Sequence, residues 1–297
     1  MHYAFADRMA ESVRRRGPLC VGLDPRWEML PAELRAKHTA DGVPNRAAAY
    51  REFCLTVLEL VHPYCACVKP QAAFFENIGW DGARVLGEIC DVARTQYDLP
   101  VILDAKRGDI STTAAAYAES AFGQFHADAL TVNPYLGADA VEPFIAEARR
   151  STPQRGLFVL VRTSNPGGGL FQNLVCDGLP LYRHVANVVA SWNATALGEC
   201  GLGDVGAVIG ATHPKELAEL RALLPQVWFL VPGYGAQGGH AADVAAAFHT
   251  DGLGAVINSS RGITFPFRPE EPLWQAKIVT AARTAQAELR QASRLFL

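Results

Sequence analysis

Short, almost continuously apolar runs recur along the chain, and each ends on polar or glycine residues. Eight such runs are found, at residues 19–24, 65–70, 100–106, 128–134, 156–163, 204–211, 227–233 and 253–260. The stretches between them are rich in alanine and leucine and have helical periodicity, as at 112–125 and 214–224. Apolar strands that alternate with helices indicate a parallel sheet covered by helices.

Eight strand–helix units in 297 residues predict the α/β class and a (β/α)8 TIM barrel, with residues 1–297 as a single domain. A doubly wound open sheet is the alternative, because periodicity alone does not show closure. Residues 1–16 are typical of an amphipathic helix. Two stretches depart from the repeating unit: an excursion after the first strand, at about 26–45, and a helical tail at about 266–297.

Composition and charge narrow the choice of partners and location. The chain is 49% hydrophobic and 19% charged, with a net charge of −3. Without a strong basic run, neither nucleic acid nor an anionic membrane surface is expected as a partner. No apolar run approaches the ~18 residues of a membrane span, and the N-terminus lacks an apolar signal core. We therefore expect a cytoplasmic protein.

The seven cysteines are scattered, which argues against a disulfide framework. Cys65 and Cys67 form the one close pair, and their two-residue spacing puts both on one face of a strand. No second pair of cysteines or histidines nearby completes a zinc site. Core packing is the expected role of this pair, and no metal site is predicted.

Polar residues follow the apolar runs. They are Asp24, Lys69, Asp104 with Lys106, Asn133, Ser164, His213, and Asn258 with Arg261. In a barrel the carboxyl ends of all strands open onto one face, where active sites are built. Any one of these residues could cap a helix instead, but together they predict a site.

The stretch VILDAKRGDI (101–110) places four charges at the end of the third apolar run. Strand alternation puts Asp104 and Lys106 on one face, while Arg107 points elsewhere and Asp109 follows where the chain turns. An ammonium flanked by two carboxylates stays protonated. This disfavours a Schiff-base lysine and favours one that stabilises a developing anion and then supplies a proton. A structural ion-pair network is the alternative.

Glycine-rich loops suggest a phosphate site. They are TSNPGGG (163–169), PGYGAQGG (232–239) and NSSRG (258–262). Loops after the seventh and eighth strands of such barrels commonly bind phosphate through backbone N–H groups. Arg261 could add a bidentate contact and Gln237 a neutral amide.

Together, LDAKRGDI, SNPGG, GYGAQGG and SSRG resemble the orotidine 5′-phosphate decarboxylase family, which carries out the last step of UMP synthesis. The motif KRGDI is similar to that of the larger bacterial members of the family. The resemblance implies a charged catalytic array with Lys106 as proton donor to C6 of the pyrimidine, completed by Asp104 and Asp109. It also implies substrate contacts: Asp24 and Lys69 to the ribose, Ser164 to the pyrimidine, and Gln237 and Arg261 to the phosphate.

The same resemblance implies a homodimer with a shared active site, in which Asp109, Ile110 and Thr113 complete the neighbouring subunit's pocket. The substrate would be orotidine 5′-phosphate and the product UMP, with no metal and no organic cofactor.

Two other functions remain open from the sequence. A Mg²⁺-dependent sugar-phosphate enzyme of the same suprafamily would need extra carboxylates at strand ends, and Glu76 is the one spare candidate. A catalytically silent nucleotide-phosphate binding protein would tolerate loss of a charged position, yet every charged position is present. His213 could be read as a general base, but no partner is visible, so a helix-start or core role is expected.

Overall fold

The computed structural model describes residues 4–235 and 239–295. Within these ranges eight strands form one parallel sheet in the order β4-β1-β12-β11-β10-β7-β6-β5. The strands are β1 (Leu19–Leu23), β4 (Cys67–Pro70), β5 (Ile102–Arg107), β6 (Ala129–Val132), β7 (Gly156–Arg162), β10 (Val205–Ile209), β11 (Phe229–Pro232) and β12 (Ala255–Ser259). Each lies within or at the edge of one of the eight apolar runs.

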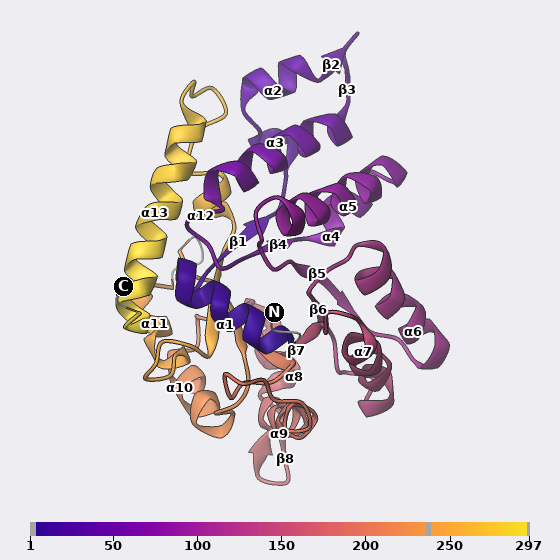
Figure 1. Ribbon diagram of the computed structural model, residues 1–297, viewed down its shortest axis with the longest axis vertical. Helices are drawn as coiled ribbons and strands as arrows, with labels where there is room; N and C mark the ends of the chain where they lie inside the picture. Colours follow the sequence, from indigo (N-terminus) through magenta and orange to yellow (C-terminus); the bar gives the residue numbers. More distant parts are fainter. Residues whose placement is uncertain (1–3, 236–238, 296–297) are drawn as a thin grey trace.

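The two ends of this sheet meet. Parallel bridges join Val68 to Val101 and Gln71 to Asp104, which places β4 beside β5. The sheet therefore closes, and Figure 1 shows the resulting ring of strands inside an outer layer of helices. The (β/α)8 barrel is confirmed, and the open-sheet alternative is wrong.

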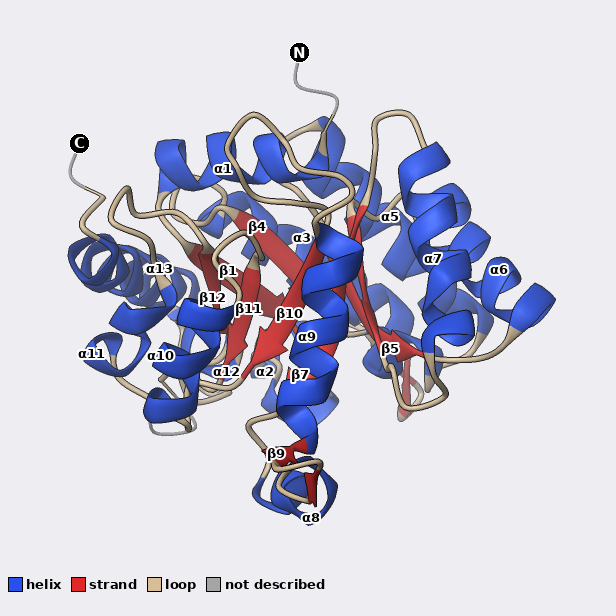
Figure 2. Cartoon of the chain, turned by 90° about the horizontal axis from the view of Figure 1, so that it is seen from below, coloured by secondary structure: helices blue, strands red, loops and turns tan. Residues whose placement is uncertain are grey.

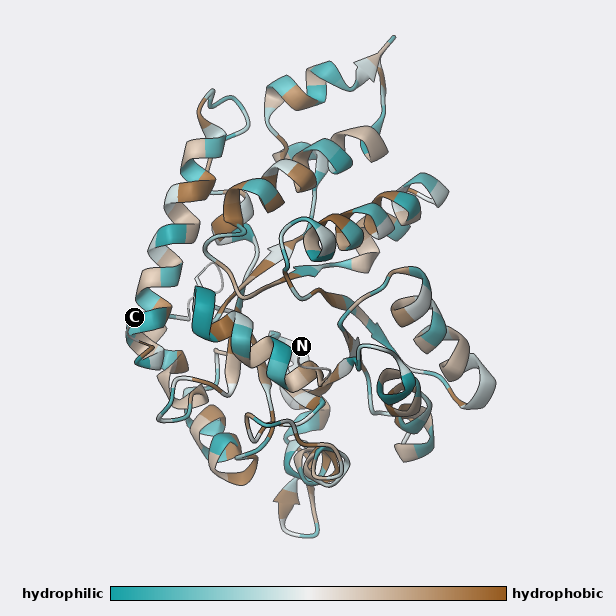
Figure 3. Cartoon of the chain, in the orientation of Figure 1, coloured by the Kyte–Doolittle hydropathy of each residue, from teal (hydrophilic) through white to brown (hydrophobic). Residues whose placement is uncertain are grey.

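Helices follow the strands around the barrel. They are α3 (Arg46–Val61), α4 (Ala72–Glu76), α5 (Trp80–Thr95), α6 (Ser111–Glu119), α7 (Ala138–Arg150), α9 (Leu181–Asn193), α10 (Pro214–Leu223), α11 (Ala241–Val244), α12 (Arg261–Thr264) and α13 (Trp274–Ser293). The helix expected at 112–125 ends its regular part at Glu119 and continues as a π-helical turn over Ser120–Gln124. Apolar residues gather on the strands and on the helix faces turned toward them (Figure 3).

Two short hairpins extend from the barrel. The excursion after β1 contains a 3-10 turn (Trp27–Met29), α2 (Ala32–Lys37) and the antiparallel pair β2 (Thr39–Ala40) and β3 (Val43–Pro44). A second insertion, after β7, contains α8 (Gly169–Gln172) and the pair β8 (Val175–Cys176) and β9 (Leu179–Pro180). Figure 2 shows this second hairpin projecting beyond the carboxyl ends of the strands.

Helix α1 (Phe5–Arg16) covers the opposite end of the barrel (Figure 2). Its buried face, including Phe5 and Met9, packs with Phe158 on β7 and with Trp228, which directly precedes β11. Ser12 donates a hydrogen bond to the carbonyl of Ala66 at 2.5 Å. The amino end of the barrel is therefore sealed, which leaves the carboxyl end as the open one.

Cys65 and Cys67 are both fully buried, as expected for core packing. Burial raises the pKa of each thiol well above its usual value. Among the described helices, none combines the length and the apolar character that crossing a membrane requires.

Candidate active site

A cavity of about 540 Å³ opens at the carboxyl ends of the strands. Seven of the residues singled out in the sequence line it: Asp24, Lys69, Asp104, Lys106, Ser164, Asn258 and Arg261. They lie at the ends of five different strands or in the segments that follow them. Barrel closure brings them together, since strand ends far apart in sequence share one rim.

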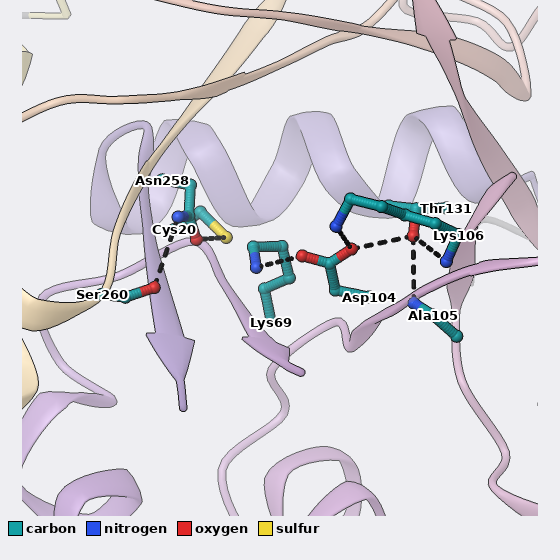
Figure 4. Close-up of polar contacts among 8 residues, drawn as sticks. All are labelled: Cys20, Lys69, Asp104, Ala105, Lys106, Thr131, Asn258 and Ser260. Carbon is teal, nitrogen blue, oxygen red and sulfur yellow. Dashed lines mark hydrogen bonds and ion pairs between the residues drawn. The ribbon is translucent and has the colours of Figure 1, made fainter. Parts of the chain in front are cut away.

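The charged centre of the cavity is Asp104, which lies between two ammonium groups. Lys69 Nζ donates to its Oδ2 at 2.6 Å, and Lys106 Nζ donates to its Oδ1 at 2.6 Å. Lys69 is 5% exposed and Asp104 6%, whereas the Lys106 side chain is 47% exposed. These two hydrogen bonds hold the Asp104 carboxylate in place (Figure 4), while the exposed Lys106 faces the open part of the cavity.

Both buried members of this array remain ionised. Burial alone would raise the pKa of Asp104, but Lys69 and Lys106 more than offset it and hold that pKa well below its usual range. Burial alone would lower the pKa of Lys69, but Asp104 and Asp24 outweigh it and raise the net pKa. The site therefore contains a negative charge on Asp104 that two ammonium groups hold in a fixed position.

Thr131 on β6 forms hydrogen bonds with this array. The sequence analysis did not single it out. Its hydroxyl donates to Asp104 Oδ1 at 3.0 Å and accepts the backbone N–H groups of Ala105 at 3.1 Å and Lys106 at 2.9 Å. Lys106 has a φ of 46°, a conformation rare for residues with a side chain. The threonine therefore stabilises an unusual backbone turn under the lysine. A polar residue inside the apolar run 128–134 was the available signal.

The side of the cavity near β1 offers an unsatisfied acceptor. Asp24 Oδ1 is buried and has no hydrogen-bond partner among the described residues. A buried carboxylate oxygen facing a cavity is a ready acceptor for a hydroxyl donor.

On another side of the cavity, Ser164 follows β7 and lies close to Gly210. A Cβ added at Gly210 would lie 2.8 Å from the Ser164 Cα. Close approach to this loop requires a glycine at that position.

The segments after β11 and β12 form the part of the rim that faces β5. Gly233, Tyr234, Ser260 and Arg261 line the cavity there. Gly233 and Gly235 have positive φ values of 102° and 76°, so the chain turns sharply on both sides of Tyr234. Gln237, the expected amide of the phosphate site, lies outside the described residues.

Three predicted residues do not line this cavity. Asp109 Oδ1 accepts the backbone N–H of Ile110 at 2.8 Å, and Ile110 is 53% exposed. Thr113 is also exposed, on the first turns of α6. Among the described residues Asp104 is the one carboxylate within ion-pair distance of Lys106. Asp109 therefore makes no ion pair with Lys106 of its own subunit, and a second carboxylate beside Lys106 stays a prediction that concerns the partner subunit.

Other polar residues at strand ends have local roles. Asn133 accepts the backbone N–H of Tyr135 at 3.0 Å. His213 stands immediately before α10, as expected for a helix start, with Nδ1 3.8 Å from Glu216 Oε1. Arg107 points away from Lys106 and forms an ion pair with Glu76. This pairing engages the one spare carboxylate that a magnesium-dependent enzyme would have used. The described residues contain no cluster of three side chains suited to holding a metal ion.

The sequence reasoning also missed several residues that line the cavity, namely Arg26, Gln71, Asn165, Tyr234 and Ser260. Arg26 and Gln71 follow the ends of β1 and β4, and the other three lie inside the quoted glycine-rich motifs, so position was the available signal. Asn258 lines the cavity as well, and this residue was predicted. Its Nδ2 lies 3.5 Å from the Ser260 hydroxyl (Figure 4).

Comparison with known proteins gives one consistent result. Residues 17–272 match the family model described as orotidine 5′-phosphate decarboxylase / HUMPS family. The chain is 48% identical over 275 residues to orotidine 5′-phosphate decarboxylase from Rhodopirellula baltica, with 90% of each chain covered. It is 46% identical over 263 residues to that from Deinococcus radiodurans, covering 88% of this chain and 89% of the relative. The solved structure of Leishmania donovani OMP decarboxylase is similar, with a TM-score of 0.78, 37% identity, and coverage of 98% and 99%.

Proposed function

The chain belongs to the orotidine 5′-phosphate decarboxylase family, and on that premise we propose how its residues carry out the reaction. It is a carboxy-lyase that converts orotidine 5′-phosphate to UMP in pyrimidine biosynthesis. The observation that carries the mechanism is the array Lys69–Asp104–Lys106, with the exposed ammonium of Lys106 turned into the cavity.

Lys106 stabilises the carbanion and protonates it. When the bond between C6 and the carboxylate breaks, its electron pair stays on C6, which has no adjacent carbonyl to delocalise the charge. An ammonium in a cavity from which the substrate excludes water interacts with this charge far more strongly than in bulk water. The Nζ proton then passes to C6, and the neutral amine is reprotonated from solvent. Each ~1.4 kcal/mol of such stabilisation accelerates the reaction about tenfold.

Asp104 acts on the substrate carboxylate. The two lysines hold it ionised and immobile, so a carboxylate bound beside it meets a fixed negative charge. That repulsion is absent once neutral CO2 has formed, and so it favours the transition state over the bound substrate. Lys69 keeps the aspartate in place and also borders the position of the ribose.

The remaining groups bind the parts of the substrate that do not react. Asp24 offers its unpartnered Oδ1 to a ribose hydroxyl, and Ser164 bonds the pyrimidine. Arg261 grips the phosphate on the rim opposite β5, together with Gln237. Binding energy from the phosphate then orients C6 against Lys106. No metal or organic cofactor takes part.

Two subunits form a homodimer with shared sites, in the cytoplasm. Asp109, Ile110 and Thr113 reach into the cavity of the partner. Their position supports this: all three lie at the turn into α6, outside the cavity of their own subunit, and Ile110 is exposed. Large apolar side chains on neighbouring segments are exposed as well, including Tyr117, Tyr135 and Leu136.

The loss of orotate absorbance from orotidine 5′-phosphate tests this function, measured with EDTA present for the wild type and for Lys106→Ala. We expect rapid turnover that survives EDTA and falls by several orders of magnitude in the variant. Turnover of a sugar phosphate only with added Mg²⁺ would overturn the proposal. Tight UMP binding without turnover by the wild type would point to a silent binding protein.

A further inference from the structure

The C-terminal helix contacts the cavity through one hydrogen bond. Tyr234, directly after β11, donates its hydroxyl to Glu288 Oε2 on α13 at 2.5 Å. The tyrosine is 8% exposed and lines the cavity, whereas the glutamate lies on the outer helical layer. Burial, together with the neighbouring Glu288, raises the pKa of Tyr234 well above its usual value, so the phenol stays a donor at neutral pH.

Among the described residues directly after β11, at 233–235 and 239, Tyr234 carries the one large side chain. Gly233 and Gly235 flank it with positive φ values of 102° and 76°. Gly235 N–H donates to the Gly239 carbonyl at 2.8 Å, and Gly239 N–H donates to the Gly233 carbonyl at 3.2 Å. Glycine backbones have the greatest conformational freedom, so Gly233 and Gly235 by themselves fix the position of this segment weakly. The buried Tyr234 ring fixes the position of this segment, and the hydrogen bond to Glu288 fixes the position of the ring.

Helix α13 also packs against α12, the short helix that begins with Arg261. It therefore contacts two of the segments that border the proposed phosphate position. Its residues, Trp274–Ser293, lie beyond the 17–272 range that matches the family model. The tail is thus connected to the cavity by contacts that the matched range does not contain.

We infer that Glu288 is a positioning residue for the decarboxylation: through Tyr234 it holds residues 233–235, directly after β11, in the position that borders the substrate phosphate. This rests on the proposed placement of the phosphate beside Arg261. The glutamate does not touch the substrate. Its loss loosens the ground-state grip on the phosphate end and leaves Lys106 and Asp104, on the facing rim, unchanged.

Steady-state kinetics of four variants test the inference. Glu288→Ala and Tyr234→Phe each remove the hydrogen bond, and we expect each to raise KM for orotidine 5′-phosphate about tenfold, the effect of losing one hydrogen bond to a charged group. We expect kcat at saturation to stay within about twofold of the wild type, because only binding is weakened. Glu288→Gln keeps an acceptor and restores most of the affinity. The double variant should be no worse than either single one.

Gln286→Ala is the matched control. Gln286 lies on the same helix and donates to the carbonyls of Arg16 and Pro63, away from the cavity. It reports what loosening α13 does by itself, and we expect its KM to match the wild type. Thermal unfolding of each variant shows whether the fold is retained.

Arg261→Ala separates the two proposals. A raised KM in Arg261→Ala with an unchanged KM in Glu288→Ala overturns the positioning role and leaves the phosphate placement standing. An unchanged KM in Arg261→Ala overturns the phosphate placement, and the inference with it. If Gln286→Ala raises KM as much as Glu288→Ala does, the contact is only structural and the inference is also overturned.

Discussion

The Thr131 hydroxyl lies 3.0 Å from Oδ1 of Asp104, the same oxygen that accepts Lys106 Nζ. The hydroxyl also accepts two backbone N–H groups from the segment that carries Lys106. One side chain on β6 thus orients both the carboxylate and the backbone of the lysine on β5. We infer that it sets the distance between the fixed negative charge and the proton donor.

Thr131→Val should lower kcat by about 10- to 100-fold. Valine keeps the shape of threonine but leaves two backbone N–H groups in this turn without an acceptor, which costs ~1–3 kcal/mol for each buried group. Thr131→Ser retains the hydroxyl and is the control, with kcat expected near the wild-type value. A loss of kcat in Thr131→Ser with a wild-type value in Thr131→Val would mean that packing by the methyl group matters and hydrogen bonding does not.

Mixed subunits test the shared site. Lys106→Ala and Asp109→Ala should each be nearly inactive alone. If Asp109 serves the partner's cavity, a heterodimer of the two variants contains one site with both residues intact. Mixing and re-equilibrating the two proteins should therefore restore up to about a quarter of the wild-type activity in a statistical mixture. Differently tagged subunits allow the heterodimer to be isolated and assayed.

Absence of any recovery in the isolated heterodimer would show that Asp109 acts in its own subunit or not at all. Size-exclusion chromatography of the wild type gives the oligomeric state needed to interpret this result.

The pH dependence follows from the ionised array. Because the pKa of Asp104 is lowered on folding, its contribution to stability is complete above the unfolded value of ~3.9 and is lost as pH falls below it. Because the pKa of Lys69 is raised, its contribution is complete below the unfolded value of ~10.4 and is lost only as pH rises further. Neither group changes charge between pH 5 and 9.

We therefore expect kcat to be free of any Asp104 or Lys69 titration across the range from about pH 5 to 9. An acid limb in kcat/KM near pH 6 belongs to the second ionisation of the substrate phosphate, which has a pKa of ~6. Stopped assays at saturating and at low substrate separate the two profiles. A midpoint in kcat near neutrality that vanishes in Asp104→Asn would contradict this assignment.

Asp128, at the amino end of β6, supports stability without a role in catalysis. Its carboxylate accepts Arg155 at 2.6 Å and Arg8 at 3.1 Å, with Arg94 at 3.5 Å. Arg155 is 5% exposed, so Asp128→Asn leaves a buried cation without its anion, at a cost of about 3–5 kcal/mol. Urea denaturation should show this loss, while kcat of the folded variant stays near the wild-type value.

Asp98→Ala is the matched control for that measurement. Asp98 pairs with Arg15 on the surface at 2.5 Å, with a side chain 82% exposed. Solvent-exposed pairs contribute only ~0–1 kcal/mol. A loss for Asp128→Asn no larger than for Asp98→Ala would show that water reaches Arg155.

The positions of the strands and of the charged residues could be read from the sequence. Strands buried on both faces must be apolar almost throughout, so β1, β7 and β12 stand out as continuous runs. Polar residues on other strands, such as Lys69 on β4 and Asp104 on β5, are visible as abrupt breaks in the apolar runs. These are local properties of the chain, and hydrophobic burial imposes them at each position separately.

Closure of the barrel and the pairing of side chains were decided by the tertiary structure. Bridges between β4 and β5 close the ring, and only then does Lys69 reach Asp104, 35 residues away. The contact of Thr131 with Asp104 and that of Tyr234 with Glu288 likewise join distant segments. The periodicity of one segment carries no information about which other segment lies against it, because that depends on the twist, register and closure of the whole sheet.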